Sequence, residues 1–193
     1  MAARFFSVKT RVSWDGVLTL ALTMSIINTH VDNEEFNPMS ITSQDSGVQR
    51  LADIEAINKL IFDYAYHLDM NHPQELVNLF VEDCEVIYGP NFGAVGREAY
   101  AKTLEGIGTY FVGTSHHVSN IVHDFKDSDE AQTRAVLYAW HRYTRERPDS
   151  HVYGQYHDVV VRVGGEWKFK RRELRVTGHK DFHVKECIPI GRA

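Results

Sequence analysis

The sequence predicts an α+β fold, in which a curved antiparallel sheet wraps around N-terminal helices and forms a cone with a deep pocket. Two observations lead to this prediction. Segments with helical periodicity come first, and a series of long alternating segments follows, so helices and strands are segregated along the chain. Segregation of this kind is typical of α+β domains, and the helices can cover the apolar face of the sheet.

The first helix is predicted over residues 51–70, where apolar residues recur every three or four positions: Leu51, Ile54, Ile57, Leu60, Ile61, Tyr64 and Leu68. At about 100° per residue, Asp69 falls at the edge of this apolar stripe, so its carboxylate borders the core. A short second helix is predicted over residues 71–80, with Pro73 in its first turn. A third helix is predicted over residues 96–107.

The strand predictions begin with a short strand at 84–89, followed by a loop at 90–93. Long strands are predicted at the segments 116–125, 131–146, 151–163 and 166–176. Gly164 and Gly165 separate the last two, which is a two-residue hairpin signal. Together these strands predict the meander that forms the sheet.

Composition excludes several classes of protein. The chain has 193 residues, of which 43% are hydrophobic, and a net charge of −5 without a long basic block, which argues against nucleic acid as a partner. No apolar run approaches the roughly 20 residues of a membrane span. Cys84 and Cys187 fit neither a disulfide framework nor a metal site, as expected for reduced thiols in a cytoplasmic protein. We expect residues 1–46 to be a poorly structured extension and residues 47–193 to form the domain.

Two adjacent histidines, His116 and His117, stand at the start of a predicted strand, so only one of them can point inward. His116 shares its face with Val118, Asn120 and Val122. His117 shares the other face with Ser119, Ile121 and His123. The first face is more apolar, so His116 is expected inside. On the next strand, His141 belongs to the more apolar face, with Ala135, Leu137, Ala139 and Tyr143.

These residue types suit proton abstraction. A histidine is the best proton acceptor at neutral pH, a carboxylate can fix its tautomer, and a tyrosine hydroxyl can donate to a substrate oxygen. Each residue also has a structural interpretation, as a satisfied core group or a helix-end carboxylate. A metal site formed by His116, His117 and His123 is disfavoured, because their spacing on one strand does not make them converge.

Three segments carry a resemblance to a known family: "DIEAINKLIFDYAYHLDM", "TSHHVSNIV" and "GGEWKFKRRE". In this order they resemble the SnoaL-like family of the nuclear-transport-factor-2-like superfamily, over residues 47–180. Within it, the similarity is to scytalone dehydratase, bile-acid 7α-dehydratase and hexachlorocyclohexane dehydrochlorinase. The resemblance implies a cone fold and elimination of water or HCl from cyclic substrates, with no metal or organic cofactor.

The resemblance also implies roles for individual residues. It makes His116, Asp69 and Tyr64 the catalytic group, and it assigns substrate contacts to Tyr88, His141 and Arg172, with Arg175 as the alternative to Arg172. An alignment shifted by one residue would place His117 in the pocket instead of His116. The chain departs from the scytalone dehydratase pattern at Leu68, where a tyrosine would be expected.

The resulting expectation is a cytoplasmic, cofactor-independent lyase, forming a trimer or dimer and acting on a small apolar cyclic substrate. The substrate would be a hydroxylated compound like a polyketide, steroid or terpenoid. One alternative is an isomerase or cyclase that forms the same enolate without losing a group. The other is a non-catalytic ligand-binding protein or a ring-hydroxylating dioxygenase β-type subunit, because this fold serves many functions.

Overall fold

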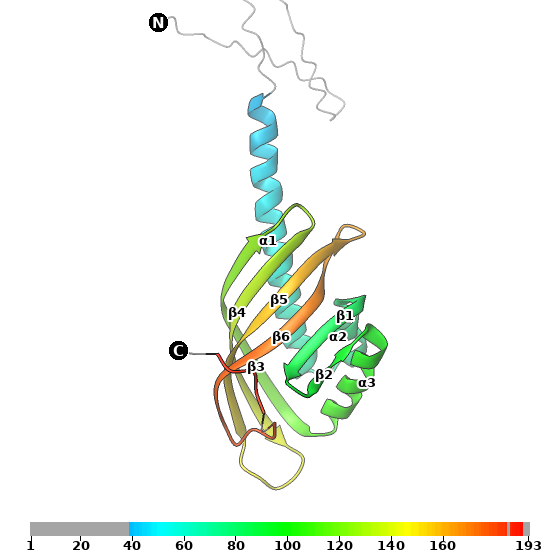
Figure 1. Ribbon diagram of the computed structural model, residues 1–193, viewed down its shortest axis with the longest axis vertical. Coiled ribbons are helices and arrows are strands. Elements are labelled where there is room, and N and C mark those ends of the chain that lie inside the picture. The colour runs from blue at the N-terminus through cyan, green and yellow to red at the C-terminus, as the bar shows by residue number, and fades with distance from the viewer. Residues whose placement is uncertain (1–38, 185, 191–193) are drawn as a thin grey trace, which may run out of the picture. The chain divides into compact units, whose positions relative to one another are not determined.

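The computed structural model describes residues 39–184 and 186–190 (Figure 1). Its elements are, in order, α1 (Met39–Asp69), α2 (Pro73–Val77), β1 (Phe80–Gly89), β2 (Phe92–Val95), α3 (Arg97–Gly108), β3 (Phe111–Phe125), β4 (Glu130–Tyr143), β5 (Ser150–Val163) and β6 (Glu166–Lys180). Most of the expected N-terminal extension lies outside the described residues, and α1 already begins at Met39. No helix of the described part is long and apolar enough to cross a membrane.

The strands form one six-stranded, curved and open sheet with the order β2-β1-β6-β5-β4-β3, and the helices lie on its inner side (Figure 1). The predicted α+β class and curved sheet are confirmed. One pairing corrects the expectation of a wholly antiparallel sheet, because β1 runs parallel to β6, with Val86 opposite Arg172. A short hairpin would force β1 and β6 to run antiparallel, but these strands are joined by a long stretch of chain, so they can pair in parallel.

The region between α1 and α3 differs most from the predicted elements. The second helix ends at Val77, and β1 begins at Phe80, where the prediction still placed helix. Strand β2 occupies part of the predicted loop, with Gly93 opposite Ile87 of β1. A four-residue strand that contains glycine is too short to show alternation, so the sequence gives little sign of it.

The apolar side chains that α1 buries against the sheet lie in its C-terminal part. Ile57, Ile61 and Tyr64 are fully buried there, as the periodicity predicts. Leu51 was predicted to lie on the same buried stripe, but 68% of it is exposed. The N-terminal turns of α1 extend past the edge of the sheet (Figure 1).

The inner face of the sheet follows the predicted alternation on β4, where Ala135, Leu137, Ala139, His141 and Tyr143 are buried. On β3 the alternation changes phase at an irregularity between Ser119 and Val122, where Asn120 has a left-handed φ of 49°. Val122 was predicted to share the inner face with His116, but it is 43% exposed, while Ile121 packs against the core. The extra residue of the bulge reverses the faces beyond it.

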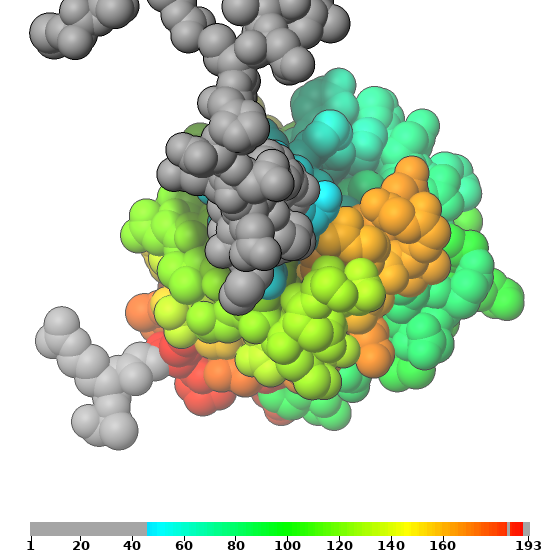
Figure 2. Space-filling view, turned by 90° about the horizontal axis from the view of Figure 1, so that it is seen from above, coloured from blue at the N-terminus to red at the C-terminus, as the bar shows by residue number. Residues whose placement is uncertain are grey.

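One end of the sheet is joined to α1 by a buried carboxylate. Asp53 is 4% exposed and pairs with Arg162 at 2.6 Å. Arg162 also donates to the carbonyl oxygen of Ser128 at 3.1 Å. This bond joins the β3–β4 turn to the β5–β6 turn. Figure 2 shows the two turns side by side, in yellow-green and orange. These contacts hold the C-terminal half of α1 over the inner face of the sheet, where the pocket lies.

Candidate active site

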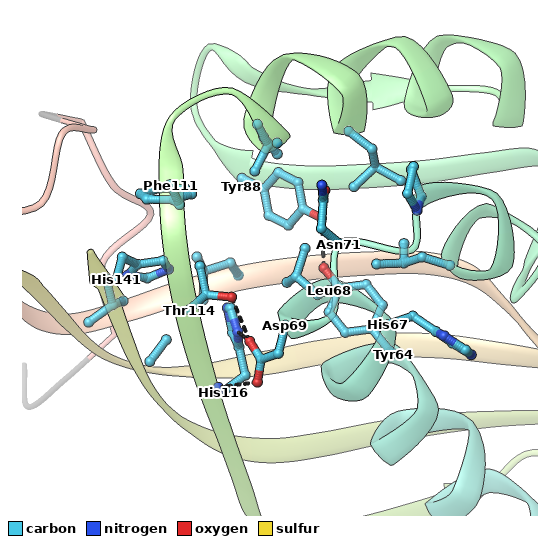
Figure 3. Close-up of a pocket in the computed structure, with 18 of the residues that line it drawn as sticks. Tyr64, His67, Leu68, Asp69, Asn71, Tyr88, Phe111, Thr114, His116 and His141 are labelled. Carbon is cyan, nitrogen blue, oxygen red and sulfur yellow. Dashed lines mark hydrogen bonds and ion pairs between the residues drawn. The ribbon is translucent and has the colours of Figure 1, made fainter. Parts of the chain in front are cut away.

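A cavity of about 240 Å³ lies between the C-terminal end of α1, the helices α2 and α3, and the inner face of the sheet (Figure 3). The segment after β6 forms part of its rim. Apolar side chains make up most of the wall, among them Leu68, Leu104, Phe111, Leu137, Val152 and Leu174. Polar groups enter from α1 and from the strands: Asp69, Tyr64, Tyr88, Thr114, His116 and His141. Such a pocket suits a largely apolar ligand with a few oxygen atoms.

Asp69 and His116 form the polar centre of this cavity. Asp69 is the last residue of α1, and its carboxylate faces β3. The ring Nδ1 of His116 lies 2.6 Å from Asp69 Oδ1, and the backbone N–H of His116 donates to Oδ2 at 2.8 Å. Thr114 Oγ1 donates to Oδ1 at 2.7 Å. The His116 side chain is only 6% exposed, so it has the inward orientation that the alternation predicts.

These hydrogen bonds determine the protonation state of Asp69 and the tautomer of a neutral His116. Burial alone would raise the pKa of the Asp69 carboxyl, but the hydrogen bonds and charge of His116 and the Thr114 hydroxyl bring that pKa below its usual value. Asp69 is therefore ionised at neutral pH and only accepts hydrogen bonds. In a neutral His116, Nδ1 then carries the hydrogen and Nε2 holds a free lone pair.

His141 lies beside this pair, with its ring centroid 5.3 Å from that of His116. Burial, together with the nearby His116 and His183, lowers the pKa of His141 to about 3. His141 is therefore neutral at physiological pH and can offer a hydrogen bond but no positive charge. Its Nδ1 lies 3.4 Å from Ser150 Oγ.

Three tyrosines meet next to the cavity. Tyr88 Oη lies 2.7 Å from Tyr64 Oη and 2.7 Å from Tyr100 Oη. Burial raises the pKa values of Tyr88 and Tyr100 well above the usual range, so both hydroxyls keep their protons at neutral pH. Sequence reasoning singled out Tyr64 and Tyr88 but missed Tyr100, because a tyrosine on the apolar face of α3 resembles any other core residue.

Arg172 lies beneath the pocket rather than in its wall. The side chain is fully buried, pairs with Asp158 at 2.7 Å, and stacks under the ring of Tyr64 at 3.9 Å. Arg172 does not line the cavity; its guanidinium lies against the rings of Tyr64 and Tyr156, which do. Sequence reasoning missed Asp158, the partner that makes burial of this arginine possible.

Two further candidate contacts, His117 and Arg175, also lie away from the cavity, whereas Tyr88 and His141 line it. His117 is exposed on the outer face of β3, next to Tyr138, because its neighbour His116 takes the inner face. Arg175 pairs with Glu173 and does not line the cavity. Thr114, which sequence reasoning overlooked, could have been found from its position two residues before His116, on the same face of the strand.

No three His, Cys, Asp or Glu side chains of residues 46–184 and 186–190 are grouped so that they could hold a metal ion. Comparison with curated proteins found no match. Among solved structures, a protein named "Putative Scytalone Dehydratase" from Novosphingobium aromaticivorans is 63% identical, with a TM-score of 0.74 over 76% of this chain and 99% of that one.

Two dehydrochlorinase structures show the same fold at low identity. A type 2 hexachlorocyclohexane dehydrochlorinase is 18% identical, with a TM-score of 0.66 over 76% of this chain and 99% of that one. The type 3 enzyme from Novosphingobium barchaimii is 17% identical, with a TM-score of 0.65 over 75% of this chain and 99% of that one. The model of the SnoaL-like domain family matches residues 49–173, well over half of the sequence, and so this chain belongs to the SnoaL-like family.

Proposed function

We propose that this protein is a cofactor-independent lyase that eliminates water from a cyclic, largely apolar, hydroxylated substrate. The observation that carries the proposal is the Asp69–His116 pair, joined at 2.6 Å and facing an apolar cavity. The 63% identity to a protein named as a scytalone dehydratase supports the same reaction class. The fold alone would not, because it serves many functions.

His116 is the base in this proposal. Its Nε2 removes a proton from a carbon next to the substrate carbonyl, and the electrons of that C–H bond form an enolate. Asp69 holds the ring in the required tautomer and stabilises the imidazolium that forms. The enolate electrons then form a carbon–carbon double bond as the C–O bond to the leaving hydroxyl breaks. The imidazolium of His116 returns its proton to that hydroxyl, which departs as water, and His116 becomes neutral again.

Neutral hydrogen-bond donors stabilise the oxygen atoms during these steps. A hydroxyl of the Tyr64–Tyr88 pair donates to the substrate oxygen that becomes negatively charged. His141 contributes a second donor when its hydrogen is on Nε2. When the hydroxyl of Tyr143 donates to Ser150, and not to Asp181 O or His183 Nδ1, the Ser150 hydrogen is free for Nδ1 of His141. This arrangement favours the tautomer with Nε2–H.

The experiment that tests the proposal follows water loss and deuterium uptake by mass spectrometry. The protein is incubated in D₂O with a panel of cyclic hydroxy-ketones, beside His116→Ala and the matched control His117→Ala. Replacing the base should lower the rate by about 10²-fold or more. His117 lies on the opposite face of the same strand, so its replacement should leave the rate unchanged.

The products separate the alternatives. Loss of water that depends on His116 supports the lyase. Deuterium uptake without loss of water would identify an isomerase or cyclase with the same base. Binding without exchange or water loss would contradict an enzymatic function and favour a ligand-binding protein or a non-catalytic subunit.

A further inference from the structure

The hydroxyls of Tyr64, Tyr88 and Tyr100 form a branched cluster with Tyr88 at its centre. They come from three elements, α1, β1 and α3, and both hydrogen bonds are 2.7 Å long. Only Tyr64 and Tyr88 line the cavity, and Figure 3 shows the Tyr64–Tyr88 bond beside Asn71 and Leu68. Tyr100 lies behind Tyr88, outside the cavity wall.

Burial determines which hydroxyl donates to which. Tyr64 and Tyr100 are both 0% exposed, and Tyr88 is the one hydrogen-bond partner that each hydroxyl has within the described residues. A buried O–H that donates to nothing loses the hydrogen bond it made with water. Tyr64 and Tyr100 therefore both donate to the Tyr88 oxygen.

This direction leaves the hydrogen of Tyr88 without a protein acceptor. Tyr88 is 9% exposed and borders the cavity, so its hydrogen can point to a bound molecule. The Tyr88 oxygen meanwhile accepts two hydrogen bonds. Hydrogen bonds in such a chain polarise one another, so the two donors make Tyr88 a stronger donor and stabilise negative charge that shifts onto its oxygen.

We propose that Tyr64 and Tyr100 are positioning residues, which fix the direction of the Tyr88 hydrogen and strengthen the hydrogen bond that Tyr88 donates to a substrate oxygen. The inference rests on the proposed function, since it names the ligand as one with an oxygen acceptor. It narrows the class to compounds whose carbonyl or enolate oxygen reaches Tyr88.

Packing holds all three rings independently of their hydroxyls. The ring of Tyr100 lies 4.8 Å from that of Phe80, and the ring of Tyr64 lies 5.8 Å from that of Tyr156, both edge to face. The ring of Tyr88 lies 5.5 Å from that of Phe92. A Tyr→Phe change at any of these positions thus keeps the ring and removes only the hydroxyl. Thermal unfolding of each variant checks that the fold is kept.

The test uses a bicyclic ketone, α-tetralone, and the hydrocarbon with the same skeleton, tetralin. Infrared spectroscopy measures the carbonyl stretching frequency of the bound ketone, which falls as its hydrogen bond strengthens. Titration measures the ratio of the two affinities. Variants Tyr100→Phe and Tyr64→Phe are compared with wild type and with the control Tyr138→Phe, which loses a tyrosine hydroxyl bond to His151 on the outer face.

The expected result is that Tyr100→Phe and Tyr64→Phe each raise the carbonyl frequency and lower the ketone-to-hydrocarbon affinity ratio about 3- to 10-fold. Tyr88→Phe should remove the ketone preference altogether, and Tyr138→Phe should change neither value. If Tyr88 instead donated to Tyr100, Tyr100→Phe would free the Tyr88 hydrogen. The hydrogen bond to the ketone oxygen would then become stronger, and the carbonyl frequency would fall. A lower or unchanged frequency in Tyr100→Phe therefore overturns the inference, as does a wild type that does not bind the ketone.

Neither measurement requires turnover. The fate of the proposed function is consequently decided separately, by water loss and deuterium uptake. If the bound ketone is polarised through Tyr88 but no water is lost from any substrate, this inference stands and the proposed lyase function is wrong.

Discussion

His116 donates two hydrogen bonds to the carboxylate of Asp69, one from its ring Nδ1 at 2.6 Å and one from its backbone N–H at 2.8 Å. The backbone bond holds the end of α1 against β3, and the ring bond fixes the tautomer of the imidazole. One carboxylate thus joins the helix to the strand and prepares the proposed base.

Replacing Asp69 with asparagine should lower kcat roughly 10²- to 10⁴-fold, as loss of the orienting carboxylate does in comparable pairs. The amide can present its NH₂ group to Nδ1, which moves the hydrogen of His116 to Nε2 and removes the base. Steady-state kinetics with the substrate found in the exchange experiment measures the effect. An activity near that of wild type would show that Asp69 does not set the tautomer.

The same variant should change how stability depends on pH. The folded pKa of Asp69 lies below its unfolded value, which is about 3.9, so its ionisation stabilises the fold above that pH. This stabilisation is lost as the pH falls through the folded pKa. The difference in unfolding free energy between wild type and Asp69→Asn should therefore shrink below about pH 4. Urea unfolding measures it, with Asp83→Asn at an exposed position as the control for the substitution itself.

His141 should destabilise the fold as the medium becomes acidic. Its folded pKa is about 3, whereas an unfolded histidine titrates near 6.5, so between these values the unfolded state binds more protons. Stability then falls with falling pH, by up to about 1.4 kcal/mol per pH unit. His141→Phe should make this slope smaller, because its ring fits beside Phe111 and Phe182 and does not titrate. The remaining slope comes from His123, His157 and His183, whose pKa values burial also lowers.

Urea unfolding at several values between about pH 4.5 and 6.5 measures the slope. The control is His117→Phe on the exposed face of β3, which should keep the slope of wild type. Equal slopes in wild type and His141→Phe would mean that His141 protonates in the folded protein as readily as in the unfolded chain.

The periodicity of apolar residues predicted those helices and strands that bury one face along their whole length. The α+β order, the C-terminal part of α1 and the inward positions of His116 and His141 follow from it, because a strand with one buried face alternates and a helix with one buried face repeats every three to four residues. The same rule failed at Leu51, where α1 extends past the sheet, and at Val122, beyond the bulge.

Features that depend on distant pairings could not be predicted this way. The parallel pairing of β1 with β6 and the Arg172–Asp158 pair join segments whose partners the local pattern does not specify. The hydrogen bond between Tyr100 and Tyr88 likewise depends on the fold, which brings α3 beside β1. The oligomeric state, the cytoplasmic location and the identity of the substrate stay predictions.

Breaking the Arg172–Asp158 pair should be costly. Arg172→Met leaves an interior carboxylate without its cation, and we expect a loss of roughly 3–5 kcal/mol of unfolding free energy. Adding Asp158→Leu removes that uncompensated charge and should restore most of the loss. Urea unfolding of both variants measures this coupling. For comparison, Arg142→Met breaks an exposed pair and should cost no more than about 1 kcal/mol.

Asn120 is the residue that allows β3 to change phase. Its φ of 49° lies in the left-handed region, which asparagine tolerates and β-branched residues do not. Asn120→Val should lower the unfolding free energy by about 1–2 kcal/mol, whereas Asn120→Gly should be close to neutral. Ser119→Val, an exposed neighbour at a position without positive φ, is the matched control and should show no comparable loss.

The Asn120 variants also test whether the bulge and the site are independent. His116 pairs with Ala139 before the irregularity, so its position does not depend on the phase change. Ile121 and Phe125 pack against the core only because the phase has changed. Asn120→Val should therefore lose stability while each folded molecule keeps its activity, measured as kcat well below the unfolding temperature. A fall in kcat at full folding would show that strain at the bulge reaches His116 along β3.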